Sequence, residues 1–481
     1  MKRALERVAK ASPRRHLLVA TSLAVALIGG GAAIGQAPVP AVPYPAALAH
    51  APSPLPDRIV LTLTEDAAHT QKVTWRTAST VATPQAQIAL AKGGPQFVAD
   101  AVTVAATSST PVQADLGFPS LFHTVEFTGL QPETQYLYRV GDGANWSEWI
   151  ELTTGSEDPE PFSFIYFGDA QNDVHQHWSR VIRRAYSDRP EAELIVHAGD
   201  LVNTSTSDKE WGEWFWAAGW VDGMVPAIAT PGNHEYAGAV LTPYWRAQLP
   251  FPDNGPQGTG PLYEAMKGSV YYVDYQGIRF VSLNSNSSAS AGQAQQWWDV
   301  QAQWLDQILT DNPNKWTVLT FHHPVFSTAE GRDNPALRAA WRPIIEKHNV
   351  DLVLQGHDHS YGRGNVPTGE SAVSDGTVYV VSVSGPKMYE VSDETWTGNG
   401  AEPKKLGENT QLYQLVDVFK EPDADGNARD VLRYEARTAI GEPYDLFEIR
   451  KGADGNKKII EMTHEEDAHA EAHELGHGHS H

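Results

Sequence analysis

Apolar and polar positions alternate in short runs through the first part of the chain. Between residues 57 and 155 the runs Ile59–Leu63 and Lys72–Trp75 are examples, and this pattern is typical of strands with one buried face. Gly129–Val140 combines a turn with a strand that carries tyrosines on one face. We therefore predict a small all-β sandwich over residues 57–155.

The pattern changes over residues 160–450, where apolar strands alternate with amphipathic helices and indicate an α/β layer fold. A helix is predicted to begin near Val174, and strands near Tyr271–Leu283, Thr377–Val383 and Arg433–Glu448 are predicted to complete a second sheet. Five further short apolar strands are predicted at Phe162–Phe167, Glu193–His197, Val225–Ala229, Trp316–Phe321 and Val350–Leu354.

Both ends of the chain differ from its middle. Residues 1–49 combine basic residues, the apolar run Leu17–Ile28 and small residues, which indicates an export signal followed by the start of a linker. We expect an extracytoplasmic protein (periplasmic, cell-surface or secreted) with no stable membrane span after cleavage, and an uncleaved anchor stays open as the alternative. Residues 459–481 form a His-rich acidic tail, suited either to gathering metal or to simple solvated disorder.

Composition narrows the possible partners. The chain has no cysteine and a formal net charge of −23. An acidic chain without a basic run repels nucleic acid, so no nucleic-acid partner is expected.

Five short motifs carry the candidate chemistry, and each directly follows one of the five strands above. Asp, Asn and His side chains without Cys favour zinc, iron or manganese, and the set is large enough for two ions. The motifs are Gly168-Asp169-Ala170-Gln171, Gly199-Asp200-Leu201-Val202-Asn203, Gly232-Asn233-His234-Glu235, His322-His323-Pro324 and Gly356-His357-Asp358-His359.

This order of motifs resembles the calcineurin-like metallophosphoesterase superfamily, and with the preceding sandwich it is most similar to purple acid phosphatases. The resemblance implies a two-sheet αββα sandwich after a fibronectin type III-like domain. It also implies two divalent or trivalent metal ions (iron, zinc or manganese) that share Asp200. Asp169 and His359 would bind the first metal, and Asn233, His322 and His357 the second.

The resemblance also suggests roles around the metals. His234 would be the general acid for the leaving oxygen, with Glu235 orienting it. His323 could touch the substrate, and Arg363 could meet a phosphate oxygen; plain structural roles remain open for both.

Two positions depart from the purple enzymes. Those enzymes have tyrosine where this chain has Asn203 and glycine where it has Gln171. Without an iron-tyrosinate bond the protein should lack the purple colour. The Gln171 amide oxygen could be a weak ligand, and Asn203 could bind a metal or support a ligand.

The sequence thus predicts an exported dinuclear phosphomonoesterase in which metal-bound hydroxide attacks a small phosphorylated substrate. A phosphodiesterase or nucleotide pyrophosphatase is the alternative within the superfamily. A non-catalytic surface adhesion or metal-binding protein is the alternative from another class, and the oligomeric state is left open.

Overall fold

A computed structural model describes residues 44–290, 292–368, 373–422 and 426–463. All of these except Tyr44 belong to one compact unit, Pro45–His481. Most of the predicted export signal and the tail beyond residue 463 lie outside the described residues. Within the described ranges, no helix is both long and apolar enough to cross a membrane.

The N-terminal domain is all-β, as predicted. A four-stranded sheet has the order β4-β3-β7-β8 and packs against strands β1, β2 and β6 around Trp75, Val125 and Tyr138. The bounds are β1 Asp57–Thr62, β2 Thr70–Ala78, β3 Gln85–Leu90, β4 Val102–Ala105, β5 Ser108–Gln113, β6 Pro119–Thr128, β7 Gln135–Gly141 and β8 Ile150–Thr153, with short helices α1 Ala46–Ala49 and α2 Phe97–Asp100.

An eleven-stranded sheet joins this domain to the larger one. Its order is β24-β23-β22-β21-β9-β10-β11-β1-β2-β6-β5, and β1 meets β11 in parallel with Thr62 opposite Ala227. The further strands are β9 Phe162–Phe167, β10 Leu194–His197, β11 Ala227–Ala229, β21 Leu412–Pro422, β22 Ala428–Thr438, β23 Pro443–Lys451 and β24 Lys457–Glu461.

Two sequence predictions fail in this sheet. Residues 433–448 lie in β22 and β23 of the first sheet, because β21 pairs antiparallel with β9 and brings β22 and β23 along as successive hairpin strands. Residues 459–461, assigned to the tail from their place in the sequence, pair with β23 as part of β24.

A seven-stranded sheet of order β14-β15-β16-β17-β19-β18-β20 forms the second layer. Phe164 of the first sheet meets Phe280 of the second edge to face, with ring centroids 5.3 Å apart, so the layers are in direct contact. The bounds are β14 Tyr271–Tyr275, β15 Ile278–Ser282, β16 Trp316–Thr320, β17 Leu352–Gln355, β18 Tyr361–Asn365, β19 Val378–Val381 and β20 Glu402–Gly407.

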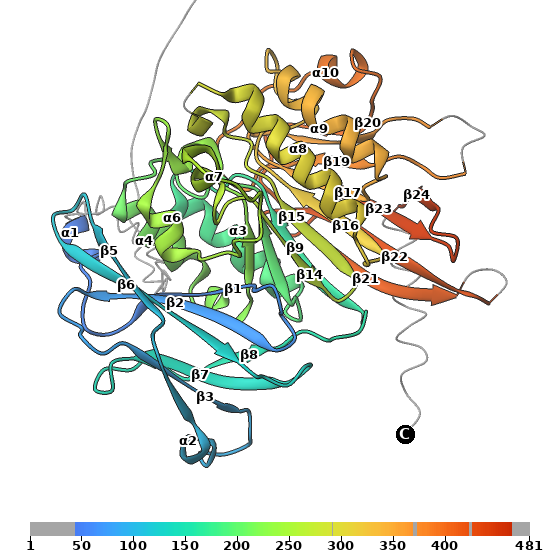
Figure 1. Cartoon of the computed structure of the whole chain (residues 1–481). Coiled ribbons are helices and arrows are strands. Elements are labelled where there is room, and N and C mark those ends of the chain that lie inside the picture. The colour runs from blue at the N-terminus through green and yellow to red at the C-terminus, as the bar shows by residue number, and fades with distance from the viewer. Residues whose placement is uncertain (1–43, 291, 369–372, 423–425, 464–481) are drawn as a thin grey trace, which may run out of the picture. The chain divides into compact units, whose positions relative to one another are not determined.

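Helices cover the outer faces of both sheets. Helix α3 (Val174–Asp188) buries one face that includes Val174, Trp178 and Ile182, as its amphipathic pattern predicts. It packs with α4 (Asp208–Ala218) on the first sheet, while α8 (Ala294–Thr310) and α9 (Pro335–Lys347) pack with the core of the second sheet (Figure 1). The predicted αββα sandwich is therefore confirmed.

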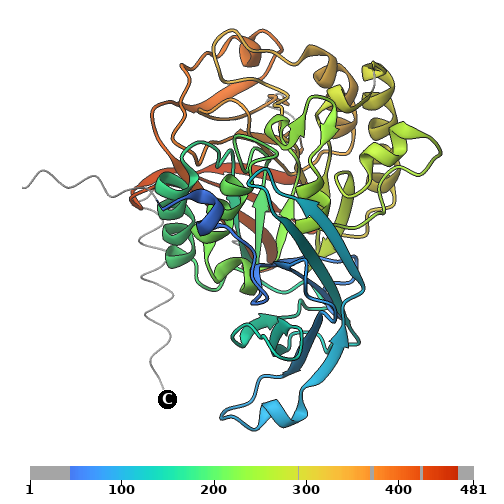
Figure 2. The same cartoon turned by 90° about the vertical axis from the view of Figure 1, so that its left-hand side faces the viewer.

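Short elements complete the fold. Figure 2 shows α1 beside the helices on the first sheet, and a Cβ added at Gly212 of α4 would meet the ring of His50, the residue after α1. The remaining elements are α5 Val221–Met224, α6 Pro243–Gln248, α7 Pro261–Met266, α10 Glu394–Thr397, the 3-10 helices η1 Asn233–Glu235 and η2 Ser287–Ser290, and the hairpin β12 Tyr236–Ala237 and β13 Val240–Leu241.

Candidate metal centre

The predicted ligands meet where strands of both sheets end. Asp169, Asp200 and Asn233 follow β9, β10 and β11 of the first sheet. His322 and the Gly356–His359 loop follow β16 and β17 of the second sheet. Parallel strands direct their carboxyl ends to one edge, so loops distant in sequence converge there.

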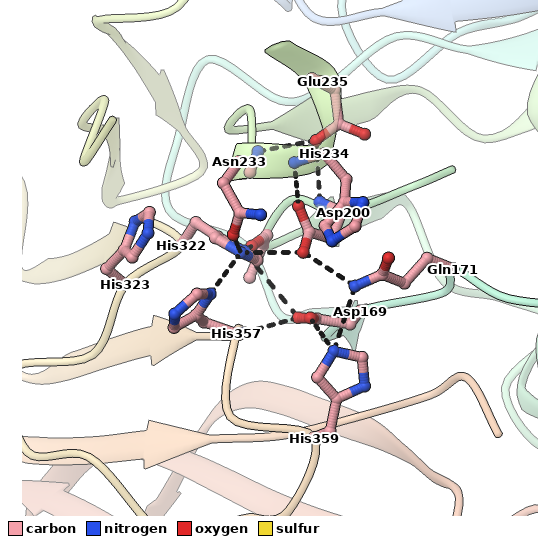
Figure 3. A network of polar contacts seen from close by, with 12 residues as sticks. Asp169, Gln171, Asp200, Asn233, His234, Glu235, His322, His323, His357 and His359 are labelled. Carbon is pink, nitrogen blue, oxygen red and sulfur yellow. Dashed lines mark hydrogen bonds and ion pairs between the residues drawn. The ribbon is translucent and has the colours of Figure 1, made fainter. Parts of the chain in front are cut away.

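The side chains form two potential ligand groups that share Asp200. One group is Asp169, Asp200 and His359; the other is Asp200, His322 and His357; within each, the ligand atoms lie within 4.8 Å of one another. Figure 3 shows Asp200 beside His322 and above Asp169. The Asn233 amide oxygen joins the second group, 3.2 Å from His322 Nε2.

Backbone carbonyls fix which ring nitrogen two histidines present. Because a carbonyl oxygen can only accept, His322 Nδ1 donates to Ala198 O at 2.9 Å, and His359 Nδ1 donates to Lys387 O at 3.1 Å. Both rings therefore turn Nε2 inward, at 3.1 Å from Asp200 Oδ2 for His322 and 3.2 Å from Asp169 Oδ2 for His359. This is the orientation that metal-binding histidines adopt.

The electrostatics of the group fit cations. Asp169 and Asp200 are almost fully buried, and Asp169 Oδ2 has no hydrogen-bond partner among the described residues. Burial, with Asp200 nearby, raises the pKa of Asp169. Burial opposes a charge on His322 as well, yet the two aspartates outweigh it and raise the His322 pKa to about 10. Positive charge is thus favoured between these carboxylates, and the donor set suits metal ions.

Close backbone approach explains two motif glycines. A Cβ added at Gly232 would stand 2.1 Å from Asp200 Oδ1, and one at Gly356 would stand 2.2 Å from Asp169 Oδ1. Three of the predicted ligands also have positive φ, with Asp200 at 53°, His357 at 74° and His359 at 37°. Such strain at non-glycine residues is characteristic of functional sites.

Gln171 and Asn203 differ in their relation to the cluster. Gln171 lies inside it: its Nε2 donates to Asp200 Oδ2 at 2.9 Å, while its Oε1 is buried without a partner among the described residues. The Asn203 amide oxygen instead accepts from Asn172 at 2.9 Å.

His234 borders the cluster with its ring orientation fixed. Its backbone N–H donates to Asp200 Oδ1 at 2.8 Å. Its ring Nδ1 donates to the Asn203 carbonyl at 2.6 Å. Nε2 is therefore the nitrogen left to exchange a proton with a ligand.

Glu235 contacts the backbone of the Asp200 loop. Its Oε2 accepts from Asp200 N at 2.8 Å and Gly232 N at 2.7 Å, and its Oε1 accepts from Leu201 N at 2.9 Å. Burial and then the Asp200 charge raise the pKa of Glu235, whereas these N–H groups favour its ionised form. Glu235 thus fastens the loop carrying Asp200 to the loop carrying Asn233.

His323 and Arg363 lie in different places. The His323 ring packs on His357, with centroids 4.2 Å apart. Arg363 is not brought to the cluster: its guanidinium binds Asp445 at 2.7 and 2.9 Å and Glu461 at 2.8 and 2.7 Å.

Two cations near the ligands were not identified from the sequence. Arg332 donates to His357 O at 2.8 Å, and its guanidinium lies 4.5 Å from the centre of the Tyr389 ring. Tyr389 packs edge-on against His359, and Lys387 Nζ lies 5.3 Å from the centre of the Tyr389 ring. Both cations are in irregular segments, where periodicity gives no signal.

Two family models match the chain. The one described as "Purple acid Phosphatase, N-terminal domain" matches residues 56–154, and the one described as "Calcineurin-like phosphoesterase" matches residues 165–361.

Individual proteins are also similar to the chain. Purple acid phosphatase 15 of Arabidopsis thaliana is 24% identical over 320 residues, which are 60% of this chain and 57% of that protein. An uncharacterized protein of Mycobacterium tuberculosis is 26% identical over 323 residues, 61% of this chain and 59% of its own. The chain thus spans about three fifths of these relatives.

The fold also resembles a solved structure. Purple acid phosphatase PPD1 from yellow lupin (Lupinus luteus) seeds superposes with a TM-score of 0.60 at 15% identity, covering 83% of this chain and 75% of that one.

Proposed function

Because this chain is a purple acid phosphatase-like member of the calcineurin-like phosphoesterases, we propose that it is an exported, dinuclear metal-dependent phosphomonoesterase. The observation that carries the proposal is the pair of ligand groups sharing Asp200. Export is proposed on the basic and apolar leader of the sequence.

Each proposed metal has its own ligands. Asp169 and His359 would hold the first ion, Asn233, His322 and His357 the second, and Asp200 both. Zinc, manganese or iron suits these oxygen and imidazole donors. When bound, two such ions neutralise phosphate oxygens and activate a water as nucleophile.

His234 is proposed as the general acid. Its Nδ1 is held by the Asn203 carbonyl at 2.6 Å, so the proton it gives to a leaving oxygen would come from Nε2. General acid catalysis of this kind is worth roughly 10²- to 10⁴-fold in rate.

The charge of Lys387 favours a monoester over a diester. A phosphomonoester carries up to two negative charges and a diester one. Arg332 is paired with the buried carboxylate of Asp358 at 3.4 Å. The charge of Lys387 lowers the pKa of His359, after the larger effect of burial, so its field reaches the site. Lys387 has no carboxylate partner within the described ranges, which leaves its charge available to an anionic substrate.

Hydrolysis of p-nitrophenyl phosphate and of bis(p-nitrophenyl) phosphate by zinc- or manganese-loaded protein tests the proposal. We expect the monoester to be preferred, and Lys387→Met to reduce that preference, with exposed Lys209→Met on α4 as the control. A preference for the diester would instead support a phosphodiesterase or nucleotide pyrophosphatase. Hydrolysis of neither ester would support the non-catalytic alternative.

The role of His234 is tested separately. His234→Ala should retain its metal content and slow turnover at least about 100-fold. His69→Ala, at a partly exposed site of the N-terminal domain, should keep wild-type turnover. Wild-type turnover in His234→Ala would remove the assignment.

A further inference from the structure

Ser285 is a buried residue between β15 and η2, and its hydroxyl makes two hydrogen-bond contacts with His323. Its Oγ accepts the backbone N–H of His323 at 2.9 Å and lies 2.8 Å from ring Nδ1 of the same residue. The side chain is almost fully buried, with the residue 3% exposed.

The hydroxyl proton has one acceptor. Among the described residues, Ser285 Oγ has no hydrogen bond other than these two with His323. A buried hydroxyl that donates to nothing carries a desolvation penalty, so the Ser285 O–H points at Nδ1. His323 Nδ1 then accepts, and in the neutral ring the proton resides on Nε2.

This ring form is opposite to that of His234, where Nδ1 donates to the Asn203 carbonyl. The two histidines thus differ in what they can offer a ligand: a neutral His234 presents a lone pair at Nε2, and a neutral His323 presents an N–H there.

His323 also lies beside two of the candidate metal ligands. Its ring packs on His357 at 4.2 Å and meets His322 edge-on at 5.1 Å between centroids. The residue is partly exposed, and Nε2 has no hydrogen-bond partner in the part of the chain that the structure describes.

We propose that Ser285 is a positioning residue that holds His323 as a neutral Nε2–H donor, and that this N–H binds an oxygen of the substrate's phosphoryl group. His234 moves a proton, whereas His323 donates a hydrogen bond and keeps its proton. The inference rests on the proposed function, but its first test reads the ring itself and needs no turnover.

Nitrogen NMR of zinc-loaded protein with ¹⁵N-labelled histidine gives that test, and loss of a signal in His323→Gln assigns the ring. We expect an unprotonated Nδ1 and a protonated Nε2 in the wild type and in Ser285→Thr, and mixed ring forms in Ser285→Ala. Inorganic phosphate should shift the Nε2 signal. The proposal would be overturned if the wild-type ring were protonated at Nδ1, or if the His323 ring form in Ser285→Ala were the same as in the wild type. It would also be overturned if saturating phosphate left the Nε2 signal unchanged.

Kinetics with p-nitrophenyl phosphate give the second test. An amide nitrogen on Gln replaces Nε2 of His more closely than one on Asn, so we expect kcat/KM to fall about 3- to 10-fold in His323→Gln and about 10- to 100-fold in His323→Asn and His323→Leu. Ser285→Ala should lose about 3- to 10-fold, and Ser285→Thr should restore it.

Equal losses in His323→Gln and His323→Leu, or no rescue by threonine, would contradict the donor role. If the wild type hydrolyses no ester, the proposed function fails, while the NMR result still decides whether Ser285 sets the ring form.

Discussion

Replacing Glu235 with Gln should weaken both the fold and the metal site, because both carboxylate oxygens accept backbone N–H groups. Oε2 accepts from the backbone N–H of Asp200 at 2.8 Å and of Gly232 at 2.7 Å, and Oε1 accepts from that of Leu201 at 2.9 Å. Whichever way the amide is turned, its NH₂ faces at least one buried N–H. One unsatisfied buried group costs about 1–3 kcal/mol, so we expect a loss of about 1–3 kcal/mol of unfolding free energy.

The same change should loosen the loop that carries Asp200, because Asp200 itself has an unfavourable positive φ of 53°. Zinc affinity should therefore fall about 10- to 100-fold. Urea unfolding of metal-free protein and calorimetric zinc titration measure the two effects.

Glu210→Gln is the matched control. Glu210 also accepts two backbone N–H groups of this loop, from Asn203 and Thr204 at 2.8 Å each, but both reach one oxygen, Oε2. An amide oxygen can replace that acceptor, so the loss should stay below about 1 kcal/mol. This reasoning would be refuted if Glu235→Gln matched the wild type in stability and zinc affinity. It would also be refuted if Glu235→Gln and Glu210→Gln lost the same amount of unfolding free energy.

Three further predictions follow from buried groups and from the metals. Burial lowers the pKa of His197 to about 3 in the folded protein, below the unfolded value of about 6.5. The free energy of unfolding therefore falls as the pH drops below 6.5, by about 2 kcal/mol between pH 7 and 5. Urea unfolding at both pH values should show a smaller loss for His197→Leu, and an equal loss would contradict it. Arg363→Met leaves the buried carboxylate of Asp445 without a cation, with only the Tyr361 hydroxyl, among the described residues, still donating to it from another side chain. It should cost about 3–5 kcal/mol of unfolding free energy without changing the KM for p-nitrophenyl phosphate; a raised KM at native stability would instead support contact with phosphate. Chelation of the metals should abolish hydrolysis and lower the melting temperature. Zinc at 100 times its Kd should restore both, because it adds about 2.7 kcal/mol to the free energy of unfolding per site. Activity that survives complete chelation would contradict the metal assignment.

The convergence of the candidate ligands could be predicted because each motif lies just beyond the end of its strand. Once Phe162–Phe167 or Trp316–Thr320 is recognised as a strand, the next residues must lie at its carboxyl end. Partner strands could not be predicted in the same way. Alternation identifies the buried face of residues 433–448 but not the sheet they join, which depends on the long-range pairing of β21 with β9.

Side-chain roles also depended on distant partners. Glu235 follows His234 in sequence, yet the 3-10 turn Asn233–Glu235 buries Glu235 and leaves the neighbouring ring partly exposed. Arg363 binds the carboxylates of Asp445 and Glu461, which are 82 and 98 residues away in the sequence. No local pattern encodes such pairs, and the same holds for Ser285 and His323, which are 38 residues apart.

Anomalous scattering from crystals of the zinc-loaded protein tests the central claim most directly. We expect two zinc peaks per chain, both ligated by Asp200, with Asp169 and His359 on one and Asn233, His322 and His357 on the other. A single peak, or two peaks that do not share Asp200, would contradict the dinuclear centre.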